Sequence, residues 1–186
     1  MSVNRAFAIL GGALLLATAS EARQATGGLQ DVAVIQDGHG AARILFRLSN
    51  QVRTLSQIRV WKATLRVPLA GLPAGRELRL RAYPVTAAWN PSTVSWTGWR
   101  RPGGDFDDEV FAERTVDLRT GPTEVVLDVT GLVKEVVERR MPGDGFILSV
   151  DPRSGVGLPV ADLPRFVGLG AATLQVTYRK SLQADS

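Results

Sequence analysis

The residues best suited to chemistry lie in one segment, Thr97 to Glu109. Trp99, Arg100 and Arg101 put an aromatic ring beside two guanidinium groups. An arginine binds a carboxylate, phosphate or sulfate group through paired hydrogen bonds, and an aromatic ring offers a flat stacking face. Four acidic residues follow: Asp105, Asp107, Asp108 and Glu109. Clustered acids in a loop are able to hold calcium, although the spacing is not that of an EF-hand, and a solvated acidic loop is the simpler alternative.

Arginines also alternate along expected strands. Arg66 lies in one strand, Arg79 and Arg81 lie in the next, and we expect all three on the polar faces of neighbouring strands. An acidic polysaccharide needs an aromatic face for its sugar ring and arginines for its carboxylates. The alternative is that these arginines cover a solvated sheet and pair with acidic residues. The predicted ligand-binding set is Arg79, Arg81, Trp99, Arg100 and Arg101.

Residues for catalysis are scarce. The chain has no cysteine and a single histidine, His39, which lies in a glycine turn. Neither a G-x-S-x-G nucleophile elbow nor a glycine-rich phosphate loop is present. We therefore predict a protein that is not an enzyme. A polysaccharide lyase or hydrolase stays open, because two carboxylates that meet only in the fold cannot be recognised from sequence.

The N-terminus has the pattern of a secretory signal peptide. Met1 to Arg5 is a short basic start, and Ala6 to Ala19 is a run of apolar and small residues. This run is too short to span a bilayer. We predict a signal peptide over residues 1–22, a flexible leader over 23–30, one domain over 31–180 and a tail over 181–186. The mature protein would be secreted, or located in the periplasm or at the cell surface.

The overall composition is that of a globular domain, with 45% hydrophobic and 22% charged residues and a formal net charge of +4. The absence of cysteine excludes a disulfide framework and a thiolate metal site. A modest positive charge allows an anionic partner. Nucleic acid is disfavoured, because export is predicted and because the basic segment adjoins an acidic one.

Short stretches with alternating apolar and polar residues predict many strands. In the expected strand 58–68, the alternation puts Trp61 on the apolar face with Ala63 and Leu65. The other expected strands are 31–36, 44–49, 77–85, 93–96, 115–118, 124–129, 146–150 and 173–178. Thr130 is the expected N-cap of a helix over 131–140. Together these elements predict an all-β fold, a jelly-roll-like β-sandwich with one short helix.

Trp89 and Trp96 flank Asn90-Pro91-Ser92, a turn that proline and short polar side chains favour. A tryptophan buries a large apolar area. We expect both rings to anchor the interior of the sandwich, at a corner where a sheet edge closes over it.

Several pieces of the chain, taken in order, resemble a known family. The most specific is Tyr83-Pro84-Val85-Thr86 leading into Trp89 and Thr93-Val94-Ser95-Trp96. The others are Phe46–Ser49, Ala63–Val67, Asp128–Val133, Gly145–Leu148 and Leu174–Tyr178. Together they resemble the DNRLRE-type β-sandwich domain, related to disaggregatase and to a family of alginate-binding carbohydrate modules. The family usually has an acidic residue where Arg47 stands. The resemblance implies an extracellular binding or structural module.

These observations predict a secreted, non-catalytic module that binds an anionic polysaccharide or another cell-surface polymer. The alternative is a structural or assembly subunit of an extracellular or cell-surface complex, with a surface protein as its partner. An exposed apolar patch or an unpaired sheet edge would be the sign of that alternative.

Overall fold

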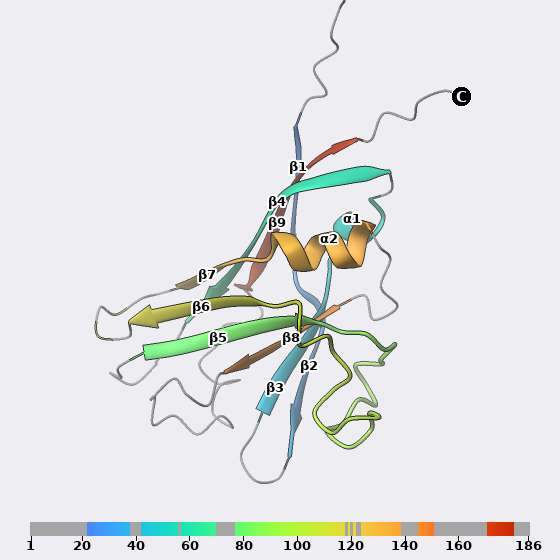
Figure 1. The fold of residues 1–186 in the computed structure, drawn as a ribbon, viewed down its shortest axis with the longest axis vertical. Helices are drawn as coiled ribbons and strands as arrows, with labels where there is room; N and C mark the ends of the chain where they lie inside the picture. Colours follow the sequence, from blue (N-terminus) through green and yellow to red (C-terminus); the bar gives the residue numbers. More distant parts are fainter. Residues whose placement is uncertain are drawn as a thin grey trace, which may run out of the picture.

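Two antiparallel sheets pack against each other in the computed structural model of this protein (Figure 1). The structure describes residues 22–37, 42–55, 57–69, 77–117, 119, 121, 124–138, 145–150 and 171–180. Residues 1–21 of the predicted signal peptide, His39, and the predicted tail lie outside the described residues.

The strands divide into a four-stranded and a five-stranded sheet. Sheet A has the order β1 (Arg23–Gly28), β9 (Thr173–Lys180), β4 (Ile58–Pro68) and β7 (Glu124–Asp128). Sheet B has the order β2 (Gln30–Gln36), β3 (Ala42–Arg47), β8 (Gly145–Val150), β5 (Glu77–Pro84) and β6 (Ala112–Asp117). Two helices complete the described elements: α1 (Asn50–Arg53) and α2 (Thr130–Glu138).

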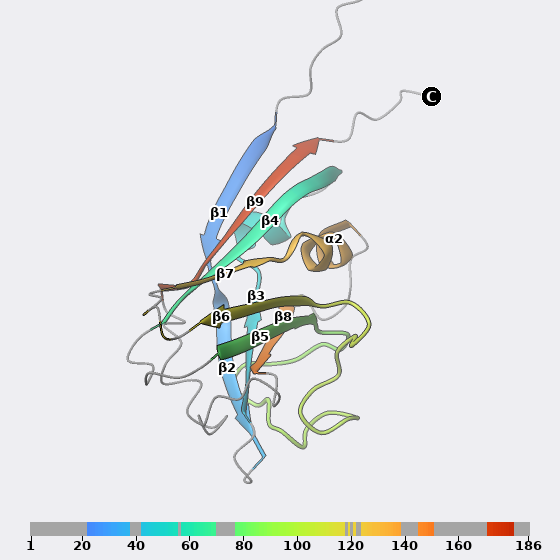
Figure 2. The ribbon, with the colours of Figure 1, turned by 60° about the vertical axis from the view of Figure 1, so that its left-hand side comes forward.

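The strand pairing is that of a jelly roll. β5 pairs with β6, β4 with β7, β3 with β8 and β1 with β9, so four antiparallel pairs are nested around the β5–β6 connection. Successive pairs alternate between the sheets, as in a long hairpin rolled into two layers. β2 adds an extra edge strand beside β3, and β1 leads almost directly into it (Figure 2). The prediction of a jelly-roll-like all-β sandwich is therefore confirmed.

Alternation along each strand builds the interior. In β4, Ala63, Leu65 and Val67 are fully buried between the sheets, and the intervening residues face outward. Burying one such aliphatic side chain contributes about 1.5–3 kcal/mol. Helix α2 covers the interior beside β4 with Leu132, Val133 and Val136. Its packing closes the side of the sandwich that the sheets leave open (Figure 1).

The start of α2 is held by hydrogen bonds rather than by the expected cap alone. Thr130 is the first helical residue, and its Oγ1 accepts the backbone N–H of Ala63 at 2.9 Å. The carboxylate of Asp128 accepts both the hydroxyl and the backbone N–H of Thr130, at 2.6 and 3.0 Å. These hydrogen bonds lower the pKa of Asp128. The helix is thereby tied to β4, one of the two inner strands of sheet A.

Three expectations about local structure are wrong. Arg23–Gly28 is not a loose leader, because it forms β1 and pairs with β9 residue by residue. Residues 93–96 form turns instead of a strand. A second helix, α1, adds one turn after β3, where Val52 is buried. The leader was misjudged because its own side chains are small and polar, while the hydrogen bonds that order it come from β9.

Candidate binding surfaces

A long loop, residues 86–111, joins β5 to β6 and lies on the outer face of sheet B (Figure 1). Trp89 is only 7% exposed and packs in a small second core with Ile35, Leu45 and Ile147. These three residues come from β2, β3 and β8 and face away from the sandwich interior. The expectation that Trp89 and Trp96 anchor that interior is therefore wrong. Trp89 anchors the loop, and Trp96 is half-buried at the edge of the same cluster.

Two arginines of β3, which sequence analysis did not select, hold this loop. Arg43 donates from Nη1 to the carbonyl of Gly103 at 2.6 Å, and its guanidinium stacks on Trp96 and Phe106 at 5.2 and 4.8 Å. Burial lowers the pKa of Arg43. Arg47 donates to the carbonyl of Trp89 and stacks on its ring at 4.8 Å. Arginine suits this position because its planar group can stack and donate at the same time.

Two glycines let the loop approach the sheet this closely. Gly103 and Gly104 have φ angles of +86° and +118°, which other residues rarely adopt. A Cβ atom on Gly104 would lie 2.5 Å from Cδ1 of Ile147. A Cβ atom on Gly103 would lie 2.7 Å from Nη1 of Arg43. The loop conformation therefore depends on the absence of side chains at both positions.

The predicted Arg79 and Arg81 lie on the outer face of β5 and share one carboxylate. Glu113 of β6 accepts from Nε of Arg81 at 2.5 Å and lies 3.6 Å from Nε of Arg79. The hydrogen bond to Glu113 raises the pKa of Arg81. Arg66 is on β4 of the other sheet, where it pairs with Glu124 at 2.8 Å. The expectation of neighbouring strands is therefore wrong, and these three arginines are paired with acidic residues.

Stacked rings connect the predicted strand residues to the predicted loop residues. Arg81 lies 5.0 Å from the ring of Phe111, which lies 6.0 Å from Tyr83. Tyr83 lies 4.8 Å from Phe106, and Arg101 lies 5.1 Å from that same ring. The fold thus brings Arg81 and Arg101 onto one outer face. These rings contact one another and the two arginines, and Phe111 remains 47% exposed.

The acidic residues of the loop serve the loop itself. Asp105 accepts the backbone N–H groups of Arg101 and Arg100 at 3.0 and 3.3 Å, and Asp108 pairs with Arg101 at 3.3 Å. Across the part of the chain that is described, no group of three or more His, Cys, Asp or Glu residues is placed to hold a metal ion. The possible calcium site at Asp105–Glu109 thus has no support from the geometry. Arg100 also lies beside a carboxylate, with its Nε 3.7 Å from Asp105, although 92% of its side chain is exposed.

The predicted Trp99 lines a cavity of about 440 Å³ in the same loop. The lining residues are Ala88, Trp89, Asn90, Thr93, Val94, Gly98 and Trp99. No charged side chain is among them. Trp99 and Arg100 are neighbours in sequence, but only the tryptophan contributes to the cavity.

A second exposed surface, on sheet A, was missed by sequence analysis. A β-bulge between Val60 and Lys62 leaves Trp61 outside the regular pairing of β4 with β9. Trp61 is therefore 64% exposed instead of facing the interior as predicted. The guanidinium of Arg179 stacks on its ring at 4.6 Å. We call Arg59, Trp61, Lys62 and Arg179 the Trp61 patch.

Among the described residues, the cations of the Trp61 patch form no close ion pair, although Lys62 contributes to the lowered pKa of Asp128. Arg59 and Arg179 stand directly opposite each other in the register of β4 and β9. Like charges in this arrangement destabilise a sheet. Within the described residues, Arg59, Lys62 and Arg179 make no ion pair within 4.0 Å. This sets them apart from the predicted arginines of the other sheet, which have carboxylate partners.

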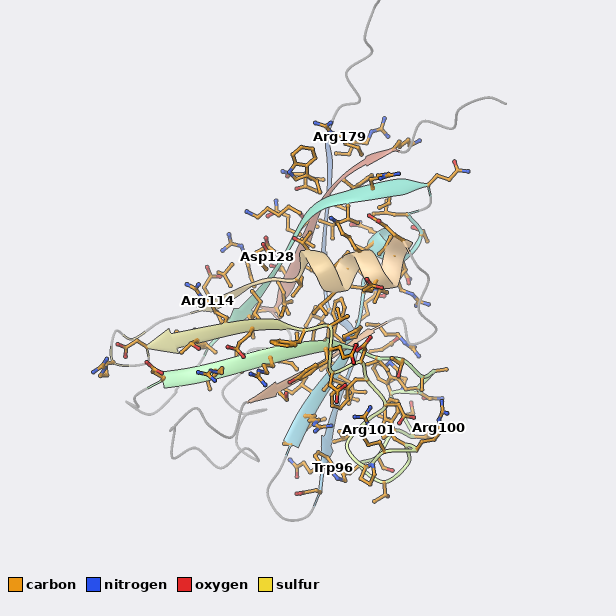
Figure 3. All side chains as sticks on the ribbon, viewed as in Figure 1. Trp96, Arg100, Arg101, Arg114, Asp128 and Arg179 are labelled. Atoms are coloured by element: carbon orange, nitrogen blue, oxygen red, sulfur yellow. The ribbon has the colours of Figure 1, made fainter. Side chains whose placement is uncertain are left out.

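A polar groove of about 560 Å³ continues from the Trp61 patch along the outer face of sheet A and reaches β6 of sheet B. It is lined by Gln24, Lys62, Thr64, Arg66, Glu113, Arg114, Val126, Asp128, Gln175 and Thr177. Lys62 belongs to both features, so the groove and the patch are continuous. Figure 3 shows Arg179, Asp128 and Arg114 along one side of the molecule, away from Trp96, Arg100 and Arg101.

The signal for this surface was present but ambiguous. Trp61 stands next to Lys62 in an alternating strand, and either residue could face outward. A regular strand places one of them inside, whereas the bulge places both outside. Arg179 comes from a strand more than a hundred residues away, and pairing alone brings it to the tryptophan.

These features define a jelly-roll β-sandwich. The long loop 86–111 lies on sheet B, and the aromatic, cationic Trp61 patch lies on sheet A. None of the helices described is long and apolar enough to cross a membrane. The sequence matches no model of a known protein family. It also matches no curated protein sequence. The resemblance to the DNRLRE-type domain therefore stays a prediction.

Proposed function

We propose that this protein is a secreted, non-catalytic module that binds an anionic polysaccharide through the outer face of sheet A. The observation that carries the proposal is the Trp61 patch, an exposed indole between three cations that make no ion pair in the described structure. An aromatic face and cations are what a sugar ring with an acidic group requires.

The electrostatics of the patch favour an anionic ligand. Arg59 and Arg179 repel each other across the β4–β9 pair, and this repulsion costs free energy in the unbound protein. A bound carboxylate or sulfate between them would remove that cost. The stack of Arg179 on Trp61 also holds the guanidinium in a fixed orientation, which reduces the entropy lost on binding.

The shape of the surface favours a chain over a small anion. From Trp61 to Arg66, β4 extends for about 17 Å at about 3.3 Å per residue. Gln24, Gln175 and Thr177 lie along this path and offer amide and hydroxyl groups to the hydroxyls of a sugar. The groove is therefore suited to several consecutive sugar units with the acidic group of one of them at the Trp61 patch.

The engaged carboxylates of the groove support a non-catalytic role. Asp128 accepts two hydrogen bonds from Thr130, and Glu113 pairs with Arg81. Hydrolysis of a glycosidic bond needs one carboxylic acid and one free carboxylate on opposite sides of that bond. An activity screen on the same polysaccharides would contradict this part of the proposal if it detected chain cleavage.

A charge-matched pair of variants tests which surface binds. Lys62→Ala with Arg179→Ala removes two cations from sheet A, and Arg100→Ala with Arg101→Ala removes two from the loop. We expect the first double variant to bind immobilised polygalacturonate, alginate or heparin at least tenfold more weakly, about 1.4 kcal/mol, and the second within about twofold of the parent. The reverse order would move the site to the loop.

Two further measurements separate stacking from charge. Trp61→Ala is expected to weaken binding by about 2 kcal/mol, roughly 30-fold, because a tryptophan that a ligand covers on binding often contributes much of the binding energy. Binding should weaken as salt is raised from about 0.05 to 0.5 M, since exposed charges are screened. Salt-independent binding, or no binding to any polyanion tested, would refute the proposal.

The N-terminal sequence supports export, because a basic start and a short apolar run are the pattern of a signal peptide. The resemblance to a family of extracellular binding modules points the same way. Recovery of the protein from the medium or periplasm, with residues of the predicted signal peptide removed, is the expected result. A full-length chain retained in the cytoplasm would contradict it.

One observation favours the alternative role as an assembly subunit. β2 pairs only with β3 among the strands described, so no described strand covers its outer edge. Val32 and Val34 on this edge are 38% and 40% exposed. An open edge with apolar side chains is able to pair with a strand of another chain. If it does, Val34→Lys should convert an oligomer to a monomer in sedimentation experiments, and a monomeric parent would remove the alternative.

A further inference from the structure

The cavity in the loop 86–111 has the chemistry of a ligand pocket. Its volume of about 440 Å³ lies in the range typical of small-molecule sites. Trp89 and Trp99 contribute aromatic side chains to the wall of the cavity, and Val94 contributes an aliphatic side chain. Asn90 and Thr93 are exposed residues of the lining and carry its side-chain polar groups. A lining with two indole rings and few polar side chains suits a ring with an apolar face and hydroxyl groups at its edge.

The cavity is formed in advance, because its walls are tied to the sheet. Arg47 binds the carbonyl of Trp89 and stacks on its ring. The turn after Trp89 is closed by the N–H of Val94, which donates to the carbonyl of Asn90 at 2.9 Å. Across the loop, the N–H of Gly103 donates to the carbonyl of Trp96 at 2.8 Å. A pocket held in this way loses little conformational entropy when a ligand enters.

The lining contains a buried polar group that has no partner in the described structure. The Nε1 atom of Trp99 is buried and has no hydrogen-bond acceptor among the described residues. Such groups are rare in proteins and call for an explanation. Asn90 uses its Oδ1 to accept the N–H of Ser92 at 2.9 Å, which leaves the amide NH₂ as a donor. The hydroxyl of Thr93 adds a group that both donates and accepts.

We propose that this cavity binds a single uncharged sugar ring, at a site separate from the Trp61 patch. No charged side chain is among the described lining residues, which favours an uncharged ligand over an acidic one. The indole of Trp99 would stack on the apolar face of the ring, and Asn90 and Thr93 would bind its hydroxyls. The site lies on the loop of sheet B, whereas the proposed polyanion surface is on sheet A. Neither proposal depends on the other.

Saturation-transfer NMR with methyl glycosides tests the inference directly. The probes are the methyl pyranosides of glucose, galactose, mannose and N-acetylglucosamine, with methyl glucuronide as the charged comparison. A single ring is expected to bind with Kd of about 1 mM, so probes at up to about 10 mM are sufficient. We expect transfer to at least one uncharged glycoside that exceeds transfer to the glucuronide and is unchanged by about 0.5 M salt.

Matched variants assign the signal to the cavity. Thr93→Arg fills the cavity from an exposed position and should reduce the transfer at least fivefold. Thr97→Arg adds the same side chain to an exposed position of the loop outside the lining and should leave the transfer unchanged. Trp99→Ala should abolish the transfer, with folding verified by near-ultraviolet circular dichroism.

Three results would overturn the inference: no transfer to any uncharged glycoside, equal transfer in Thr93→Arg and the parent, or loss of transfer in Trp61→Ala. The last result would place the sugar on sheet A. Failure of polyanion binding would leave the inference intact, because these probes carry no charge.

Discussion

Removal of the Arg43 guanidinium tests how the long loop is held. Arg43→Met keeps the apolar stem but deletes the hydrogen bond to Gly103 and the stacking on Trp96 and Phe106. A hydrogen bond from a charged donor contributes about 1.5–3 kcal/mol, and a partly buried cation–π contact about 0.5–2 kcal/mol. Because these terms overlap, we expect the free energy of unfolding to fall by about 2–4 kcal/mol. Urea denaturation followed by circular dichroism measures it.

A double-mutant cycle separates the stacking from the rest. Arg43→Met and Trp96→Leu should couple by about 1 kcal/mol, because the two side chains are in direct contact. Arg43→Lys keeps the charge but loses the planar group, and we expect it to recover less than half of the loss. Arg114→Met is the matched control, an exposed arginine whose replacement should change stability by less than about 0.5 kcal/mol.

Two results would refute this reasoning. If Arg43→Met destabilised the protein no more than Arg114→Met, the hydrogen bond and the stacks would contribute nothing net. If the destabilisation were large but the coupling with Trp96 were zero, the loop would be held by other contacts, such as those of Trp89 in the second core.

Two further predictions concern stability. Gly104→Ala should destabilise the protein by about 2–4 kcal/mol in urea denaturation, from backbone strain at φ +118° and the contact with Ile147. The control, Gly131→Ala, meets open space in α2 and should stabilise by about 0.5–1 kcal/mol; equal effects would contradict the argument. Hydrogen bonds from Arg119 hold the pKa of Asp117 at about 2, below its ordinary 3.8. This lowered pKa stabilises the fold fully above about pH 3.8, and the contribution is lost as the pH falls through about 2. Melting temperatures of the parent and Asp117→Asn should therefore converge on acidification, and a constant difference would count against the pair.

Most strands of the sandwich were predictable, because the alternation of apolar and polar residues within a strand shows which of its side chains are buried. The expected strand 58–68 matches β4 at both ends, and the expected strand 77–85 matches β5 to within one residue. Alternation of apolar and polar residues is a local property, and it requires no knowledge of the partner strand. The expected helix over 131–140 likewise corresponds to α2, which spans Thr130–Glu138.

The candidate sites were less predictable because they depend on partners distant in sequence. Trp99 was selected and does line a cavity, but Arg79, Arg81 and Arg101 turned out to be paired with Glu113 and Asp108. The sequence does not distinguish an unpaired arginine from an ion-paired one, because the carboxylate that pairs with an arginine can come from any strand.

The sequence by itself determined the all-β class, the positions of most strands and the presence of aromatic and basic side chains outside the core, because periodicity and composition are local. Only the tertiary structure decided which of those side chains are available. A bulge in β4 turns Trp61 outward, β9 brings Arg179 onto its ring, and β3 supplies the two arginines that hold the long loop. Strand register and strand order determine these contacts. Both depend on pairing between segments that are distant in the sequence, so no single segment predicts them.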